Sequence, residues 1–213
     1  MNNDPQFELL LRGFPVDAIG STEETIYGLR PDLTIAYVNK GWTQFASRNG
    51  GGLSPFLKSP IDCQFLDAIS SILRPFFADH FAKCLQERRP WEHHYECSSP
   101  QLRRQFVMMT YPLGKGEGLL VVNSIEQESP HSRTAHEPVD AIYRDESGLI
   151  KQRCHCRRVQ RSGRVPAWDW VPDWANVFPP NTSHGLCEPC FGYYYPKQGR
   201  PTKEFPKAFR SSE

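Results

Sequence analysis

Two close pairs of cysteines near the C-terminal end of the 213-residue chain carry its clearest chemical signal. One residue separates Cys154 from Cys156, and two residues separate Cys187 from Cys190. Zn²⁺ prefers four soft or borderline ligands in a tetrahedron, and two thiolates on one tight turn supply adjacent corners. The spacing therefore predicts a structural zinc site formed by these four cysteines.

Two histidines provide alternatives for the fourth zinc ligand. His184 stands three residues before the second pair, so it either replaces Cys154 or donates a hydrogen bond to a thiolate. His155 is the other candidate. A redox dithiol is less favoured because such pairs usually begin a helix in a βαβ unit. An iron–sulfur cluster is weaker still, and covalent haem attachment is excluded because Phe191, not histidine, follows the second pair.

The remaining cysteines, Cys63, Cys84 and Cys97, stand singly among apolar residues and are predicted to be small buried hydrophobes. The total of seven is odd, and residues 1–5 lack the basic and apolar regions of a secretory signal. A disulfide framework is therefore not expected. No apolar run approaches the roughly 20 residues of a membrane span. We expect a soluble, cytoplasmic protein without a membrane partner.

Charge and composition divide the chain. The net charge of +1 argues against a protein built to coat nucleic acid or an anionic membrane, and 38% apolar residues suffice for a core. Residues 1–130 carry a net −3 and residues 131–213 a net +4, with a polar, Pro-containing stretch between them. We predict an N-terminal extension (1–22), a first domain (23–128), a linker (129–145), a Cys-rich module (146–198) and a basic flexible tail (199–213).

The first domain shows a regular order of elements. Two β-branched runs, 25–29 and 34–38, flank a Pro-Asp turn and predict a hairpin. Asn39 follows and predicts the cap of a helix over 40–48. Helical spacing covers 68–87, with Pro75 placed to begin its second segment. Three strands then follow, at 91–97, 104–111 and 118–125, and tight turns make neighbouring strands antiparallel.

This order, together with the run from Ile26 to Asn39 (IYGLRPDLTIAYVN), resembles a PAS domain over residues 23–128. The resemblance implies an α+β fold, with a five-stranded antiparallel sheet and helices on one face. It also implies a module that senses a ligand or a state and passes the signal on through dimer contacts. The ligand itself does not follow from the fold.

The C-terminal half has a resemblance of its own. The stretches 156–159 (CRRV), 168–172 (WDWVP) and 183–190 (SHGLCEPC) are similar to a Cys-rich tail that follows PAS, GAF and receiver modules in bacterial signalling proteins. In that pattern the first pair is Cys-x-x-Cys, but here Arg153 holds the first position and Cys154 is displaced by one. The resemblance implies a small, zinc-ribbon-like segment stabilised by metal.

Two residues of the PAS-like part are candidate cofactor contacts. Cys63 lies in the stretch 62–67 (DCQFLD), which is similar to a degraded flavin-binding motif in which Gln64 replaces the phosphate-pairing Arg. His80 lies in the predicted long helix, where some related sensors place a haem ligand. Packing roles are favoured for both, and the ligand of the PAS-like part stays unknown.

Polar residues of the predicted strands are candidates for lining a cavity. His93 and His94 are adjacent in one strand, so they point to opposite faces and one of them can face inward. Glu96, Arg103 and Arg104 are further candidate lining residues.

A basic run without any acidic residue spans 151–164; its members are Lys151, Arg153, Arg157, Arg158, Arg161 and Arg164. The favoured interpretation is that these side chains offset the charge of the zinc thiolates and face a protein partner; contact with nucleic-acid phosphates is the alternative. Aromatic residues follow, namely Trp168, Trp170, Trp174 and Tyr193–Tyr195. They are predicted to pack over the metal site, and a partner-binding patch is the second interpretation.

The sequence as a whole predicts a sensory, signal-transducing protein that acts through a protein partner and a homodimer. A zinc-containing, nucleic-acid-binding transcriptional regulator is the alternative. A zinc enzyme would need an open site with three protein ligands and a water molecule. No nucleophile, base and orienting group form a recognisable arrangement, so we expect no catalytic activity and assign no catalytic residue.

Overall fold

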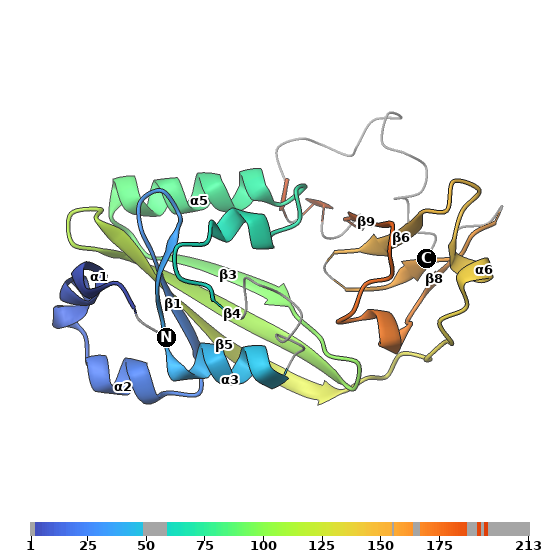
Figure 1. The fold of residues 1–213 in the computed structure, drawn as a ribbon, viewed down its shortest axis with the longest axis horizontal. Helices are drawn as coiled ribbons and strands as arrows, with labels where there is room; N and C mark the ends of the chain where they lie inside the picture. Colours follow the sequence, from blue (N-terminus) through green and yellow to red (C-terminus); the bar gives the residue numbers. More distant parts are fainter. Residues whose placement is uncertain are drawn as a thin grey trace. The chain divides into compact units, whose positions relative to one another are not determined.

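The computed structural model describes residues 3–48, 59–154, 156–163, 167–186, 191–192 and 194–195 (Figure 1). The chain divides into two compact units. The first unit comprises residues 1–95 and 105–127, and the second comprises 96–104 and 128–213. Within the described residues, no helix is long and apolar enough to cross a membrane.

The first sheet has five strands in the order β2-β1-β5-β4-β3. Its strands are β1 (Thr25–Leu29), β2 (Ile35–Val38), β3 (Trp91–Glu96), β4 (Leu102–Leu113) and β5 (Gly118–Pro130). Strand β1 runs antiparallel to both neighbours, with Tyr27 opposite Val38 in β2 and opposite Val121 in β5. The predicted α+β class with a five-stranded antiparallel sheet is confirmed, although β4 and β5 are longer than the predicted strands.

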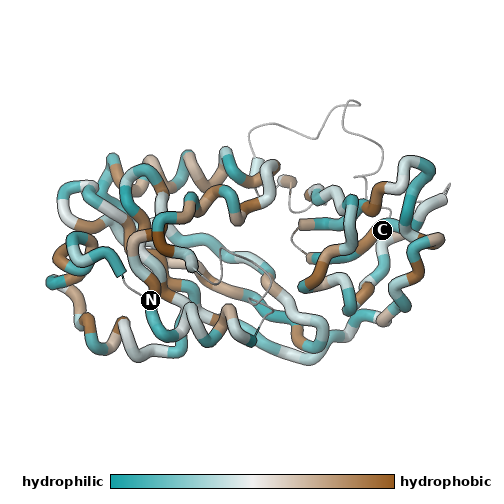
Figure 2. Tube along the Cα trace, viewed as in Figure 1, coloured by the Kyte–Doolittle hydropathy of each residue, from teal (hydrophilic) through white to brown (hydrophobic). Residues whose placement is uncertain are grey.

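Three helical elements follow β2 and pack on one face of this sheet. They are α3 (Lys40–Arg48), the 3-10 turn η2 (Phe65–Ala68) and α5 (Arg74–Glu87), with Pro75 in the first turn of α5 as predicted. Figure 2 shows hydrophobic and hydrophilic residues alternating along α5. The ring of Tyr27 lies 5.4 Å from Phe65 and 5.3 Å from Trp42, so aromatic packing joins this face to the helices.

The N-terminal helical elements cover the opposite face; they are α1 (Pro5–Leu10), η1 (Leu11–Gly13) and α2 (Val16–Ser21). Because side chains alternate along β1, Ile26 points away from Tyr27 and packs with Phe7 and Leu11. A Cβ on Gly28 would lie 2.1 Å from the Phe7 ring, so only glycine fits. Helices were predicted on one face of the sheet, but they cover both faces. The N-terminal helices were not predicted because α1 and α2 are too short to show a recognisable helical period.

The free edge of β2 is covered by two other segments. Asn3 exchanges hydrogen bonds with the backbone of Val38 at 3.1 and 3.3 Å, and the backbone of Asp4 donates to the same strand. Further along the strand, the amide of Ile35 donates to the carbonyl of Cys63 at 2.9 Å. These contacts satisfy the exposed backbone groups of an edge strand, which otherwise invite pairing with another chain.

The second unit contains a four-stranded sheet in the order β8-β7-β6-β9. Its elements are α6 (Asp140–Tyr143), β6 (Ile150–Arg153), β7 (Val159–Gln160), β8 (Trp168–Asp169), the 3-10 turn η3 (Pro172–Trp174) and β9 (Thr182–Gly185). Strands β6 and β9 are parallel, and the other pairs are antiparallel. A small core joins Tyr143, Ile150, Val159, Val171 and Trp174. Tyr143 comes from residues 129–145, to which the sequence assigned a linker.

Candidate functional site

The first cysteine pair lies at the end of β6, beside the end of β9. The parallel register places Arg153 opposite Gly185, and the backbone N–H of Cys154 donates to the carbonyl of Gly185 at 2.8 Å. Cys154 and Cys156 are both half-buried. The turn that carries these two cysteines therefore lies beside Gly185, which stands two residues before Cys187 in the sequence.

The segment after the second pair also returns to Cys154. The amide of Tyr195 donates to the carbonyl of Phe191 at 2.8 Å. Burial raises the pKa of the Tyr195 hydroxyl, and the nearby charge of Cys154 raises this pKa further. Cys187, Cys190 and His155 lie outside the described residues. Within the residues described, no three His, Cys, Asp or Glu side chains group together to hold a metal ion.

His184, the alternative fourth ligand, is part of a hydrogen-bond chain in the second unit. Gln152 donates from Nε2 to the carbonyl of Trp174 at 2.9 Å, so its Oε1 accepts from Nε2 of His184 at 3.1 Å. The imidazole packs edge-on against Phe178, with 4.7 Å between ring centroids. Burial lowers the pKa of His184 to about 4, and the charge of Arg157 acts in the same direction. The neutral ring has Nε2 committed and Nδ1 left as its acceptor nitrogen.

Most of the predicted basic run has partners inside the second unit. Lys151 pairs with Asp145 at 3.2 Å, Arg161 pairs with Asp169, Arg153 stacks on Trp168 at 4.1 Å, and Arg157 stacks on Phe178 at 4.9 Å. Arg158 has an intermediate exposure, and Arg164 lies outside the described residues. The run is therefore not a continuous stripe of exposed cations.

Arg133 links the cysteine turn to Glu96, which the sequence placed in a cavity lining. Its guanidinium forms an ion pair with Glu96 at 3.0 Å, with side chains only 14% and 12% exposed, and donates to the carbonyl of Cys156 at 3.1 Å. The same group lies 5.3 Å from the ring of Trp170, which also packs on His131. Sequence reasoning missed Arg133 because its partners are far away in the chain.

The other predicted residues of this half are dispersed. Trp174 lies in the small core with Tyr143 and Val171, and the predicted packing of the three tryptophans over a metal site stays a prediction. Tyr194 is buried, whereas Tyr193 lies outside the described residues. Arg104 pairs with Glu128 at 2.5 Å, and Arg103 is exposed.

Asp169 is a buried polar hub of the second unit. It accepts a hydrogen bond from the hydroxyl of Tyr143 at 2.9 Å and another from Arg161, and His136 lies 3.6 Å away. Burial would raise the pKa of Asp169, but the hydrogen bonds from Arg161 and Tyr143 bring it below its usual value. No local sequence pattern predicts these contacts of Asp169, because its partners come from three separate segments of the chain.

The inner face of the first sheet carries a row of stacked rings on β3. His93 is only 1% exposed and lies between Trp91 and Tyr95, at 5.4 and 5.8 Å. Phe77 of α5 meets the same imidazole edge-on at 5.4 Å. His94 points the other way and is exposed, paired with glutamates of β3 and β5. Of the two histidines, His93 is the one that faces inward.

His80, the candidate haem contact, packs against this row. Its Nδ1 lies 2.8 Å from the carbonyl of Phe76, one helical turn earlier. Its ring stacks on Trp91 at 4.6 Å with an interplanar angle of 26°. Through these contacts, His80 of α5 packs against Trp91 of β3.

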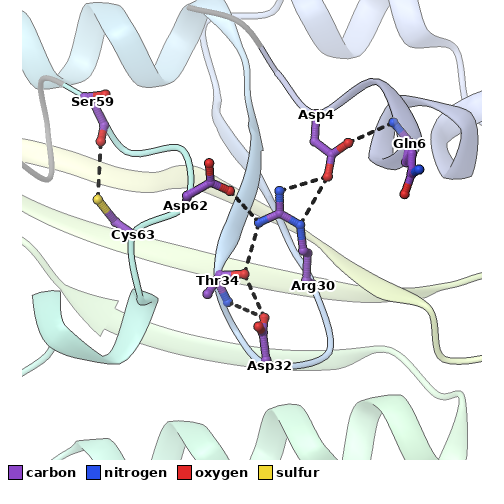
Figure 3. Close-up of polar contacts among 8 residues, drawn as sticks. All are labelled: Asp4, Gln6, Arg30, Asp32, Thr34, Ser59, Asp62 and Cys63. Atoms are coloured by element: carbon purple, nitrogen blue, oxygen red, sulfur yellow. Dashed lines mark hydrogen bonds and ion pairs between the residues drawn. The ribbon is translucent and has the colours of Figure 1, made fainter.

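Cys63, the candidate flavin contact, lies in the segment that covers the edge of β2. Its Sγ donates to the carbonyl of Ser59 at 3.3 Å and points toward it (Figure 3). The neighbouring Gln64 donates from Nε2 to the carbonyl of Asp32 at 2.9 Å. Gln64, at the position of the flavin motif's Arg, thus holds the β1–β2 turn.

Arg30 is the centre of a polar cluster that was not predicted from the sequence (Figure 3). Its Nε and Nη2 bind Asp4 at 3.1 and 2.8 Å, and its Nη1 reaches Thr34 at 3.1 Å and Asp62 at 2.9 Å. Hydrogen bonding to Arg30 holds the pKa of Asp4 below its usual value. Asp4, Arg30 and Asp62 also line an open depression of about 700 Å³. The guanidinium binds three segments together at the rim of this depression.

Comparison with known protein families finds no match for this sequence. A search of curated proteins likewise finds none. Among solved structures, the PAS domain of Bordetella pertussis BvgS aligns with a TM-score of 0.43 and 15% identity, over 58% of this chain and 88% of that one. The likeness is distant, and the first unit is defined by its own strand order and helices.

Proposed function

We propose that this chain is a PAS-type sensory and interaction module followed by a zinc-binding unit, and that it signals through a protein partner as a homodimer. The observation that carries the PAS assignment is the five-stranded antiparallel sheet, with a hairpin and helices before its last three strands. This is the architecture that the resemblance of the run Ile26–Asn39 implies.

Asn39 shows how that run organises the first unit. Its Oδ1 accepts from the amide of Trp42 at 2.9 Å, which caps α3, and from the amide of Ile26 at 3.0 Å. Its Nδ2 donates to the carbonyls of Glu24 and Ile19 at 2.9 and 3.0 Å. One buried side chain thus ties β1, the start of α3 and the end of α2, which supports a rigid sensor scaffold.

Pairing between β6 and β9 supports the zinc site. Gly185, two residues before Cys187 in the sequence, accepts a hydrogen bond from the amide of Cys154. Tyr195, five residues after Cys190 in the sequence, has its pKa raised by the nearby Cys154. Described residues on both sides of the second cysteine pair are therefore near the first pair, which supports a shared metal site.

The four cysteines are accordingly the ligand set of this proposal. His184 is assigned to a supporting position, because its Nε2 already donates to Gln152. Zinc supplies no reaction here. It closes the turn after β6 onto the end of β9, and structural zinc contributes roughly 10–16 kcal/mol of coupled folding free energy in small domains.

A protein partner is favoured over nucleic acid by the basic run. Arg157 and Arg161 contact Phe178 and Asp169, and Arg153 is buried against Trp168, so the three do not form an exposed stripe for nucleic-acid phosphates. Nucleic-acid contacts would need cations at the surface to release counterions. The proposal assigns no catalytic step to either unit and places the chain in the cytoplasm, where thiols stay reduced.

The zinc and dimer parts are tested by a native mass spectrum of the full chain purified under reducing conditions. We expect one zinc per chain in a dimer. The double substitution of Cys187→Ser and Cys190→Ser should abolish zinc retention, whereas Cys63→Ser, the matched control in the first unit, should retain it. A folded, zinc-free wild-type protein would contradict the zinc site, and a monomer would contradict the dimer.

The fourth ligand is separated by two single substitutions. Cys154→Ser should reduce zinc retention strongly, and His184→Gln should leave one zinc per chain. The reverse result would assign the position to the histidine. The nucleic-acid alternative is tested by fluorescence anisotropy with random-sequence duplex DNA at increasing salt. Tight binding with a steep loss on adding salt would replace the protein-partner proposal.

A further inference from the structure

One face of the second sheet holds a buried guanidinium edge without a partner. Arg153 is only 7% exposed, and both its Nε and its Nη2 lack a hydrogen bond. In arginine these two nitrogens carry the parallel N–H bonds that pair with two oxygens of one carboxylate or phosphate. Among the described residues, no ion pair includes Arg153. A buried cation in this state is costly unless an anion meets it.

Trp168 holds this guanidinium in place. Its ring lies 4.1 Å below the Cζ of Arg153, so stacking fixes the plane of the guanidinium and leaves the edge free. The indole Nε1 of Trp168 is itself buried without a hydrogen-bond partner. A third N–H donor therefore stands beside the arginine edge.

Gln160 adds an acceptor to the same face. It is the direct cross-strand neighbour of Trp168, and β7 pairs with β6 so that Gln160 and Arg153 point to one side of the sheet. Its Oε1 is buried and unpaired. Gln160 and Trp168 are each half-buried, so part of both side chains is exposed to solvent.

We propose that this face binds a small carboxylate that carries a hydroxyl or amino group beside the carboxyl. The carboxylate oxygens accept from Nε and Nη2 of Arg153 and from Nε1 of Trp168. The hydroxyl or amino group donates to Oε1 of Gln160. That acceptor distinguishes the ligand from sulfate, which is fully ionised at neutral pH and has no proton to donate. This ligand site belongs to the second unit and is independent of the PAS and zinc assignments.

The competing source of negative charge is the chain itself. Arg153 directly precedes Cys154, so the thiolates of the proposed zinc site are the alternative partner of its edge. The added carboxylate and the thiolates predict different effects of changing Arg153. A carboxylate site predicts that changing Arg153 affects binding of an added ligand and leaves zinc retention intact.

The test is calorimetric titration of the full chain, as purified under reducing conditions, with L-lactate, propionate, methyl L-lactate and sulfate. We expect saturable binding of L-lactate, weaker binding of propionate, which lacks the hydroxyl, and none of the neutral ester or of sulfate. Arg153→Lys, which keeps the charge and loses the fork, should weaken L-lactate binding by about tenfold or more. Trp168→Phe, which keeps the ring and loses the donor, should weaken it by about threefold to tenfold.

Arg158→Lys, from the same basic run, is the matched control and should bind L-lactate like the wild type. Circular dichroism identifies variants that are misfolded, and Trp168→Phe serves as the second variant if Arg153→Lys does not fold. No saturable binding of any probe, or equal binding by wild type and both variants, overturns the proposal. Loss of zinc from Arg153→Lys without a response to L-lactate assigns the arginine edge to the thiolates.

Discussion

The two units fill their interiors with different kinds of side chain. The first unit packs rings against rings, with Phe65, Phe77 and Phe81 of the helices over Tyr27 and Trp91 of the sheet. Among its described residues, the second unit has a small apolar cluster of five members, and Gln152, Arg153 and Asp169 are also buried. Apolar burial stabilises by about 25 cal/mol per Å², so the first unit has the larger hydrophobic contribution.

This difference indicates that the second unit depends more strongly on specific polar contacts. Two of its strands, β7 and β8, are two residues long and supply few ladder hydrogen bonds. Asp169 and Gln152 join elements that those strands hold weakly. Small units of this type commonly use a metal to become stable, which couples binding to folding.

Zinc removal should produce the largest difference in stability between the two units. After treatment with a strong chelator, we expect amides of β6 and β9 to lose protection, because the proposed zinc holds the turn after β6 against the end of β9. Amides of β1 and of residues 118–122 should stay protected by the aromatic core. Hydrogen exchange followed by mass spectrometry measures both regions in one sample. Unchanged protection of β6 and β9 would show that the second unit needs no metal.

Phe81→Ala should have the next largest effect, confined to the first unit. The side chain is fully buried and touches rings from both layers, so its loss should destabilise this unit by about 3–5 kcal/mol. Urea unfolding measures the change. Leu9→Ala, at a 52% exposed position, is the control and should cost less than about 1 kcal/mol. Zinc loss from Phe81→Ala would show that the units do not fold independently.

Asn39→Ala should cost about 2–3 kcal/mol, because it removes the cap of α3 and leaves buried carbonyls without a donor. The neighbouring Thr43→Ala, which removes only a 3.5 Å contact on the exposed side of α3, should cost less than about 0.5 kcal/mol. Thermal unfolding compares the two variants. Similar melting temperatures for both would remove Asn39 from its central role in the first unit.

The smallest expected effect is a pH dependence of stability that comes from one histidine in each unit. The pKa values of these two histidines are shifted in opposite directions. Hydrogen bonds to Glu92 and Glu126 raise the pKa of His94, so its stabilising contribution is present below pH 6.5 and is lost as pH rises through the raised pKa. Burial lowers the pKa of His184 to about 4, so the second unit loses stability as pH falls from 6.5 toward 4.

NMR titration of the imidazole protons measures both values directly. We expect His94 to protonate above pH 6.5 and His184 near pH 4. His184→Gln should remove the acid sensitivity of β9 amide protection, with His94→Gln as its control. A His184 midpoint near 6.5 would contradict the buried hydrogen bond with Gln152.

Local signals predicted the first unit well. The Pro-Asp turn, the β-branched runs and Asn39 act within a few residues of each other, and the observed β1, β2 and α3 match them closely. The extra length of β4 and β5 was missed, because residues 126–130 are polar and carry no alternation. Phe7 and Leu11 were missed as core residues for a related reason, since α1 has only six residues.

The sequence by itself determined the hairpin, the capped helices and the residue types of the predicted zinc ligands, because turn chemistry, capping and helical spacing act over short distances. Only the tertiary structure decided which distant segments meet. The parallel pairing of β6 with β9 brings Cys154 to Gly185. The fold likewise gives Arg30 its partner Asp4 and leaves the edge of Arg153 without one. Such contacts depend on burial and long-range pairing, which local periodicity does not encode.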